Sequence, residues 1–249
     1  IEAVTGVQTC ALPICIPFSG FDNDSTNRIN RAEVANKLTL TTNGSMPLNI
    51  PTPLPLSNSS AFSNAGHPSV AYNPSGFNGY KYWMAYTPYP DASRENPCIV
   101  CSNNGIDWVV PIGLTNPIVS TSQIGSNNSD THLIFSADGT KLILYFRSVI
   151  LAGTNELISY LTSINGSVWT TPITVINLAN ANNTGLLSPA VIIETNGTFS
   201  MWSVNMNPTS FASRVEKRTS PDGITWSAPS VGVMNGIGTF TPYHLDVHL

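Results

Sequence analysis

The chain has 249 residues, of which 41% are hydrophobic and 10% charged, and its formal net charge is −4. The hydrophobic share is sufficient for a folded core, and the low charge with abundant Ser, Thr and Asn is typical of secreted or particle-surface proteins. The sequence has no basic stripe that would neutralise phosphates, and no apolar run of about 18 residues, the length of a membrane helix. We therefore expect no nucleic-acid partner, no membrane span, and a location that is secreted, extracellular or on a virion.

We do not expect residues 1–66 to belong to the folded core. Residues 4–14 (VTGVQTCALPI) resemble the translation of a DNA-sequencing adapter that recurs in metagenomic assemblies. We accordingly expect residues 1–16 to be foreign sequence without a folding role, and the natural start to be missing, because the chain opens on Ile1. Residues 17–66 are predicted to be an irregular linker region, since four prolines within Met46–Leu56 favour an extended chain.

A decapeptide pattern, Ser-x-Asn/Asp-Gly-x-x-Trp-x-x-Pro, occurs three times. The copies span residues 102–111, 163–172 and 220–229, so their spacings are 61 and 57 residues. A repeat of this length is one supersecondary unit that must stack on its neighbours to bury its apolar face. The Asn-Gly or Asp-Gly pair predicts a type I′ turn, and the Trp predicts an apolar anchor buried between adjacent units.

Runs with strand composition recur in step with this motif. They are residues 67–72, 79–86, 130–135, 139–146, 188–193, 197–204 and 243–249. Each unit then holds four antiparallel strands, which is the composition of a β-propeller blade. We predict an all-β fold, a β-propeller fragment with blades at about 67–120, 130–178 and 187–234, and with 242–249 as the first strand of a fourth blade. No helix longer than three turns is expected between residues 67 and 242.

The repeat also predicts which side chains share one rim of the propeller. In our alignment the innermost strands open at His67, Asp130, Ser188 and His244. Glu95 and Glu156 each lie seven residues before a repeated Ser, on loops that reach the same rim. Further candidates for substrate binding on this rim are Arg94 and His132, and Trp83, Tyr86 and Tyr89 as a wall on which sugar rings stack.

This arrangement resembles the five-bladed propeller glycosidases related to arabinanases and invertases, and the repeated turn resembles the Asp-box turns of sialidases. The resemblance covers about residues 67–249. It implies that Asp130 is one catalytic carboxylate, paired with Glu95 or Glu156 as acid and base. Because the alignment brings these carboxyls to one rim, we also expect mutual repulsion and partial burial to raise the pKa of at least one of them. His67, Ser188 and His244 depart from the pattern of that family. Segments 79–90 and 95–108 also resemble propeller proteins of phages and gut metagenomes.

Two functions follow as alternatives. The first is a glycan-recognising propeller that hydrolyses glycosidic bonds, and the second is a non-catalytic recognition or structural module of a phage tail or surface protein. Both take a poly- or oligosaccharide as the ligand, and virion or surface-protein partners are expected for the second. We expect no cofactor and assign no metal ligand, with a divalent cation held by His and carboxylate groups in the central channel as the alternative.

Overall fold

The computed structural model describes residues 65–88, 95–121, 126–150, 155–179, 185–207, 210, 212–232 and 242–247. The expectations for residues 1–16, for the linker up to residue 64, and for Tyr89 and Arg94 lie outside these residues. Within the described ranges all regular structure is β, and no helix is long and apolar enough to cross a membrane.

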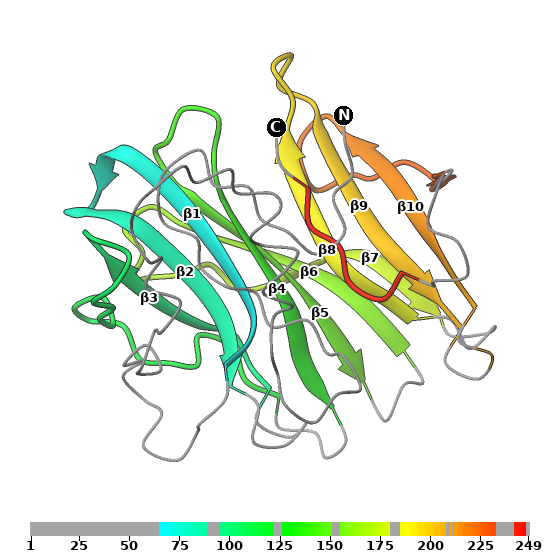
Figure 1. Cartoon of the computed structure of the whole chain (residues 1–249), viewed down its shortest axis with the longest axis horizontal. Helices are drawn as coiled ribbons and strands as arrows, with labels where there is room; N and C mark the ends of the chain where they lie inside the picture. The colour runs from blue at the N-terminus through cyan, green and yellow to red at the C-terminus, as the bar shows by residue number, and fades with distance from the viewer. Residues whose placement is uncertain are drawn as a thin grey trace, which may run out of the picture.

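The strands form three antiparallel sheets that lie side by side (Figure 1). Blade one contains β1 (Ala65–Phe77), β2 (Tyr80–Pro88) and β3 (Cys98–Ser102). Blade two contains β4 (Asn127–Phe135), β5 (Leu142–Ile150), β6 (Asn155–Ser163) and β7 (Ile173–Ala179). Blade three contains β8 (Gly185–Ile193), β9 (Phe199–Met206), β10 (Ser213–Ser220) and β11 (Ser230–Val231). Because β4 packs against both β1 and β8, the first strands of the blades lie together, as in a β-propeller. The predicted fold, a partial propeller, is confirmed.

Two predicted strands are not formed. Blade one has three strands, and only an isolated bridge between Cys101 and Val109 stands where the fourth was expected. The chain after this bridge contains Pro111 and Pro117, which have no N–H to donate to a ladder. Residues 242–247 run beside β8 as an irregular segment without strand pairing (Figure 1).

The repeated motif forms a side-chain-capped loop and not the type I′ turn that we predicted. Among the described residues of the three copies, only the glycines have a positive φ, between 72° and 76°. In blade two, Ser163 Oγ accepts the Gly166 N–H at 2.7 Å, and Asn165 Oδ1 accepts the N–H groups of Ser167 and Val168 at 2.9 and 2.8 Å. The serine and Asx side chains thus satisfy the loop backbone, which makes the second positive φ unnecessary.

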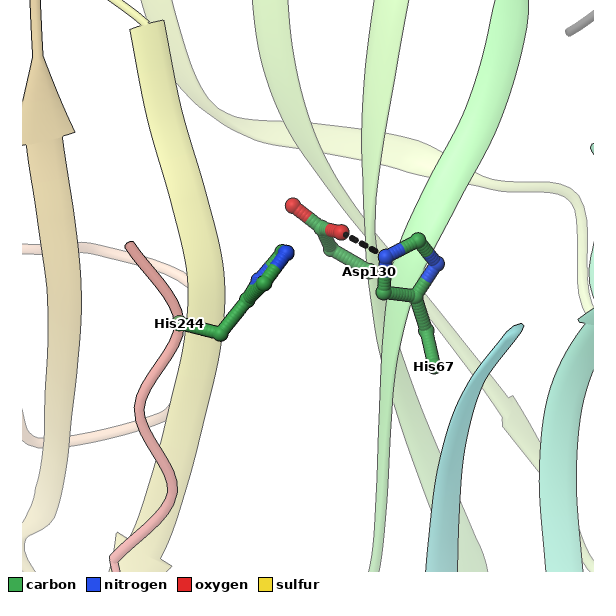
Figure 2. A group of neighbouring side chains, drawn as sticks. All are labelled: His67, Asp130 and His244. Carbon is green, nitrogen blue, oxygen red and sulfur yellow. Dashed lines mark ion pairs between the residues drawn. The ribbon is translucent and has the colours of Figure 1, made fainter. Parts of the chain in front are cut away.

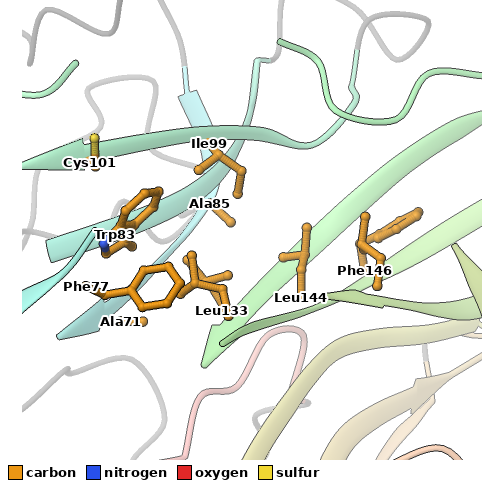
Figure 3. Close-up of a cluster of buried hydrophobic side chains, with 11 residues drawn as sticks. Ala71, Phe77, Trp83, Ala85, Ile99, Cys101, Leu133, Leu144 and Phe146 are labelled. Carbon is orange, nitrogen blue, oxygen red and sulfur yellow. The ribbon is translucent and has the colours of Figure 1, made fainter. Parts of the chain in front are cut away.

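In blades two and three the motif contacts the preceding blade. Trp169 packs against a core cluster that blades one and two share, and the Trp226 ring lies 6.1 Å from the Tyr145 ring of blade two. Figure 3 shows that cluster, where Trp83 and Phe77 of blade one meet Leu133 of blade two. The expected position of the tryptophans between blades is therefore found for Trp169 and Trp226, which stay partly exposed. Trp108 is buried against its own blade.

Candidate functional site

The innermost strand of each blade has a bulge at one left-handed residue. The φ angles are 49° at His67, 51° at Asp130 and 52° at Ser188, and each residue lies within a register shift of β1, β4 or β8. This conformation costs a non-glycine residue roughly 1–2 kcal/mol. Strained residues at bulges commonly aim a side chain at a functional site. The three opening positions that the repeat predicted are thus equivalent in structure.

Three side chains from different parts of the chain meet at these positions (Figure 2). His67 comes from β1, Asp130 from β4 and His244 from the segment 242–247, and one nitrogen or oxygen of each lies within 4.8 Å of the others. His67 Nε2 is 3.0 Å from Asp130 Oδ1, and the two imidazole rings are 5.3 Å apart. We call His67, Asp130 and His244 the central cluster.

His67 lies between two carboxylates. Its Nδ1 is 3.2 Å from Glu95 Oε1 and from Thr87 Oγ1, and its Nε2 faces Asp130. Burial alone would lower the pKa of His67, but hydrogen bonds to Asp130 and Glu95 and the negative charge of both raise this pKa to about 10. His67 is therefore an imidazolium cation at neutral pH and donates from both nitrogens.

Asp130 is buried and ionised. Its Oδ2 accepts the Ser188 N–H at 3.1 Å and lies 3.9 Å from Arg147 Nη1. Burial alone would raise its pKa, but the hydrogen bond from His67 and the positive charges of His67 and Arg147 hold the pKa well below its usual range. The expectation of a carboxyl pKa raised by repulsion is thus wrong at Asp130, because cations separate the carboxylates.

Arg147 connects the third predicted carboxylate to the cluster. It makes a two-pronged contact with Glu156, at 3.0 Å from Nε and 2.7 Å from Nη2, while Glu156 Oε2 also accepts the Leu186 N–H at 2.8 Å. Glu95 and Glu156 therefore both reach the surroundings of Asp130, as the spacing before the repeated Ser indicated. Arg147 was not among the predicted site residues, although a lone cation within the apolar strand Leu142–Ile150 was a usable signal.

His244 is held by Ser188. Its Nδ1 is 2.6 Å from Ser188 Oγ. Burial lowers the pKa of His244, the charges of His67 and Arg147 lower it further, and Asp130 opposes them. His244 is consequently neutral at pH 7 beside the cationic His67, so that the two histidines have different chemistry.

Three other candidates occupy different places. His132 Nε2 lies 2.7 Å from the Val191 carbonyl oxygen, and His132 lines a cavity of about 550 Å³ between β1, β4 and β8 instead of joining the cluster. Trp83 and Tyr86 are 0% and 2% exposed. The stacking role predicted for these two is wrong, because they lie in β2, whose residues 83–88 are all buried.

The central cluster offers two imidazole nitrogens and one carboxylate oxygen. Such a donor set suits a divalent transition-metal ion better than Mg²⁺ or Ca²⁺, which prefer oxygen ligands. Asp130 and His244 could bind without changing their charge. His67 would first have to release its Nε2 proton.

No known family profile matches the chain. A search of curated proteins finds the A type blood N-acetyl-alpha-D-galactosamine deacetylase of Flavonifractor plautii, 27% identical over 222 residues. The match covers 73% of this chain and 29% of the relative. A crystal structure of an N-acetylgalactosamine deacetylase from F. plautii in complex with blood group B trisaccharide superposes with a TM-score of 0.65 and 27% identity, and covers 74% of this chain and 58% of that one. The chain thus spans less than two thirds of these relatives.

Two more distant structures share the fold alone. The Penicillium chrysogenum alpha-L-arabinanase, complexed with arabinobiose, has a TM-score of 0.50 at 14% identity and covers 70% of this chain and 51% of that one. The Hadza microbial sialidase Hz136 has a TM-score of 0.50 at 13% identity, with coverage of 68% and 38%. The expected resemblance to arabinanase and sialidase propellers is confirmed at the level of the fold.

Proposed function

We propose that this chain is part of a carbohydrate-active propeller that binds a glycan ending in an N-acetylated sugar at the central cluster and hydrolyses the acetamido group. The observation that carries the proposal is the convergence of His67, Asp130 and His244 within 4.8 Å. It occurs in a chain that is 27% identical over 222 residues to a deacetylase of such sugars.

The charges around the cluster favour acyl hydrolysis over cleavage of glycosidic bonds. A glycosidase of the two-carboxylate type needs one carboxylic acid that carries a proton at working pH. Here Glu156 is paired with Arg147, and Glu95 and Asp130 flank the His67 imidazolium. Amide hydrolysis instead needs a base for water and positive groups near the developing oxyanion. The neutral His244 suits the first role, and His67 and Arg147 suit the second.

A divalent cation would fit the same chemistry. Held by His67, Asp130 and His244, it would polarise the amide carbonyl and lower the pKa of a bound water. The protein groups that would orient the ligands in that case are Arg147, 3.9 Å from Asp130, and Glu95, 3.2 Å from His67.

Non-catalytic glycan recognition is the second candidate function. It is favoured by the observation that each carboxylate at the cluster already has a cationic partner, as in a rigid binding surface. Extracellular location, phage association and partners on a virion remain predictions from composition and sequence resemblance.

The test uses the full chain and two oligosaccharides, one ending in N-acetylgalactosamine and one ending in galactose. We expect free acetate from the first and not from the second, no new reducing ends from either, and loss of acetate release in Asp130→Asn. The assay is run with and without added Zn²⁺ or Mn²⁺. New reducing ends without acetate would contradict the proposal in favour of a glycosidase, and binding without either product would favour the recognition module.

A further inference from the structure

Ser188 contacts two members of the central cluster at once. Its backbone N–H donates to Asp130 Oδ2 at 3.1 Å, and its hydroxyl lies 2.6 Å from His244 Nδ1. Asp130 belongs to blade two, Ser188 to blade three, and His244 to the segment that follows blade three. Ser188 therefore connects two residues of the site, Asp130 and His244, that lie 114 positions apart in the sequence.

The backbone at Ser188 is arranged for this double contact. Its φ of 52° is left-handed, a conformation that serine rarely adopts, and it lies at the bulge of β8. In a regular strand the N–H lies in the plane of the sheet and the side chain stands roughly perpendicular to it, whereas at this bulge both reach the cluster. Ser188 is also the one half-exposed residue between Gly185 and Ala190, which are otherwise buried.

We infer that Ser188 is a positioning residue for His244: its hydroxyl oxygen accepts the Nδ1–H of the imidazole, which fixes the orientation of the ring and leaves the unprotonated Nε2 for the ligand. This inference rests on the proposed function for the ligand at Nε2, and on the hydrogen bond and the bulge for its geometry. A reacting or metal-binding histidine commonly has its second nitrogen held by such a partner, and loss of the partner typically weakens metal binding about 10- to 100-fold.

The geometry around His244 leaves this task to Ser188. Tyr243 touches the ring edge-on, with centroids 4.6 Å apart, and His67 lies 5.3 Å away at a tilt of 55°. These ring contacts restrict where the imidazole lies but do not distinguish its two nitrogens. Among the described residues, the Ser188 hydroxyl is the hydrogen-bond partner that does.

The experiment compares Ser188→Ala and Ser188→Gly with the wild-type full chain. Both variants lack the hydroxyl, but only glycine relieves the left-handed strain, so the pair separates the hydrogen bond from the backbone conformation. The matched control is Ser148→Ala, which removes a buried hydroxyl bonded to Asn128 and not to His244. Thermal unfolding verifies that each variant is folded.

The deciding readout is the ¹⁵N NMR spectrum of the imidazole groups, assigned with a His244→Gln variant. We expect one His244 tautomer in the wild type and in Ser148→Ala, and a mixture of both tautomers in Ser188→Ala and Ser188→Gly. Titration with Zn²⁺ or Mn²⁺ should give about 10- to 100-fold weaker binding in both Ser188 variants.

An unchanged single tautomer in Ser188→Ala would overturn the inference. A mixture of tautomers in Ser188→Ala together with a single tautomer in Ser188→Gly would overturn it as well, because the backbone strain and not the hydroxyl would then be the cause. The tautomer does not depend on catalysis. If the wild type releases no acetate but its His244 tautomer depends on Ser188, the proposed function fails and the positioning role stands.

Discussion

His67 is the residue whose charge most affects the stability of the site. Its pKa is raised from 6.5 to about 10, so the folded state holds the proton more tightly than the unfolded state does. The resulting stabilisation is complete below pH 6.5 and is lost as the pH rises through 10. We predict that below pH 6.5 the wild type is more stable than His67→Gln by on the order of a few kcal/mol. This difference in the free energy of unfolding should shrink steadily as the pH approaches 10.

Urea unfolding of both proteins at several pH values measures this difference. Glutamine is the suitable replacement because it keeps hydrogen-bond donors near Asp130 and Glu95 without the charge. A difference that stays constant across this range, or grows with pH, would mean that His67 is not held as an imidazolium.

Arg147 and Glu156 form a nearly buried pair, with 17% and 7% of their side chains exposed. Removing one partner leaves an unpaired charge, which typically costs about 3–5 kcal/mol, whereas removing both is often much less damaging. We predict that Arg147→Met lowers the free energy of unfolding by an amount in this range and that Arg147→Met/Glu156→Gln recovers a large part of it. Chemical denaturation of Arg147→Met, Glu156→Gln and the double variant tests this prediction. A double variant that is no more stable than Arg147→Met would refute it.

At the scale of elements, the capped loops connect the blades. A Cβ on Gly166 would lie 2.1 Å from the Trp83 ring, and Gly166 also has a φ of 76°. Gly197 has a similar φ of 83° but open space around the Cβ position, so Gly197→Ala measures the backbone strain alone. We predict that Gly197→Ala costs about 1 kcal/mol and that Gly166→Ala costs an additional 1–3 kcal/mol or more from overpacking.

The measurement is the free energy of unfolding of the two variants under identical conditions. Equal losses would show that the loop of blade two does not press on Trp83, and would argue against the inter-blade packing described above.

The strands were easier to predict from sequence than the turns. Repeated Gly, Trp and apolar runs at matching distances indicated the blades, because packing demands the same residue types in each unit. The capped loop was missed, since an Asn-Gly pair suits a type I′ turn as well, and the hydrogen bonds from the Ser and Asx side chains to the loop backbone decide between them. Trp83 and Tyr86 were misassigned because an aromatic run on a strand has the same composition whether one or both faces are covered.

For the whole molecule, the repeat alignment was enough to bring Asp130, Glu95, Glu156 and His67 to one rim. Equivalent positions in neighbouring blades are close in space even when they are far apart in sequence. The chemistry of that rim could not be predicted, because it depends on Arg147, 3.9 Å from Asp130, and on hydrogen bonds of about 3 Å whose partners come from different blades. These contacts turn an expected set of repelling carboxylates into a set of paired charges.

The central claim is that the glycan binds where His67, Asp130 and His244 meet. The most direct test is to follow the assigned imidazole signals of the full chain by NMR while an oligosaccharide ending in N-acetylgalactosamine is added. We predict saturable shifts of the His67 and His244 signals that are reduced for the same oligosaccharide ending in galactose. Saturable binding that leaves both signals unmoved would place the glycan elsewhere and contradict the account.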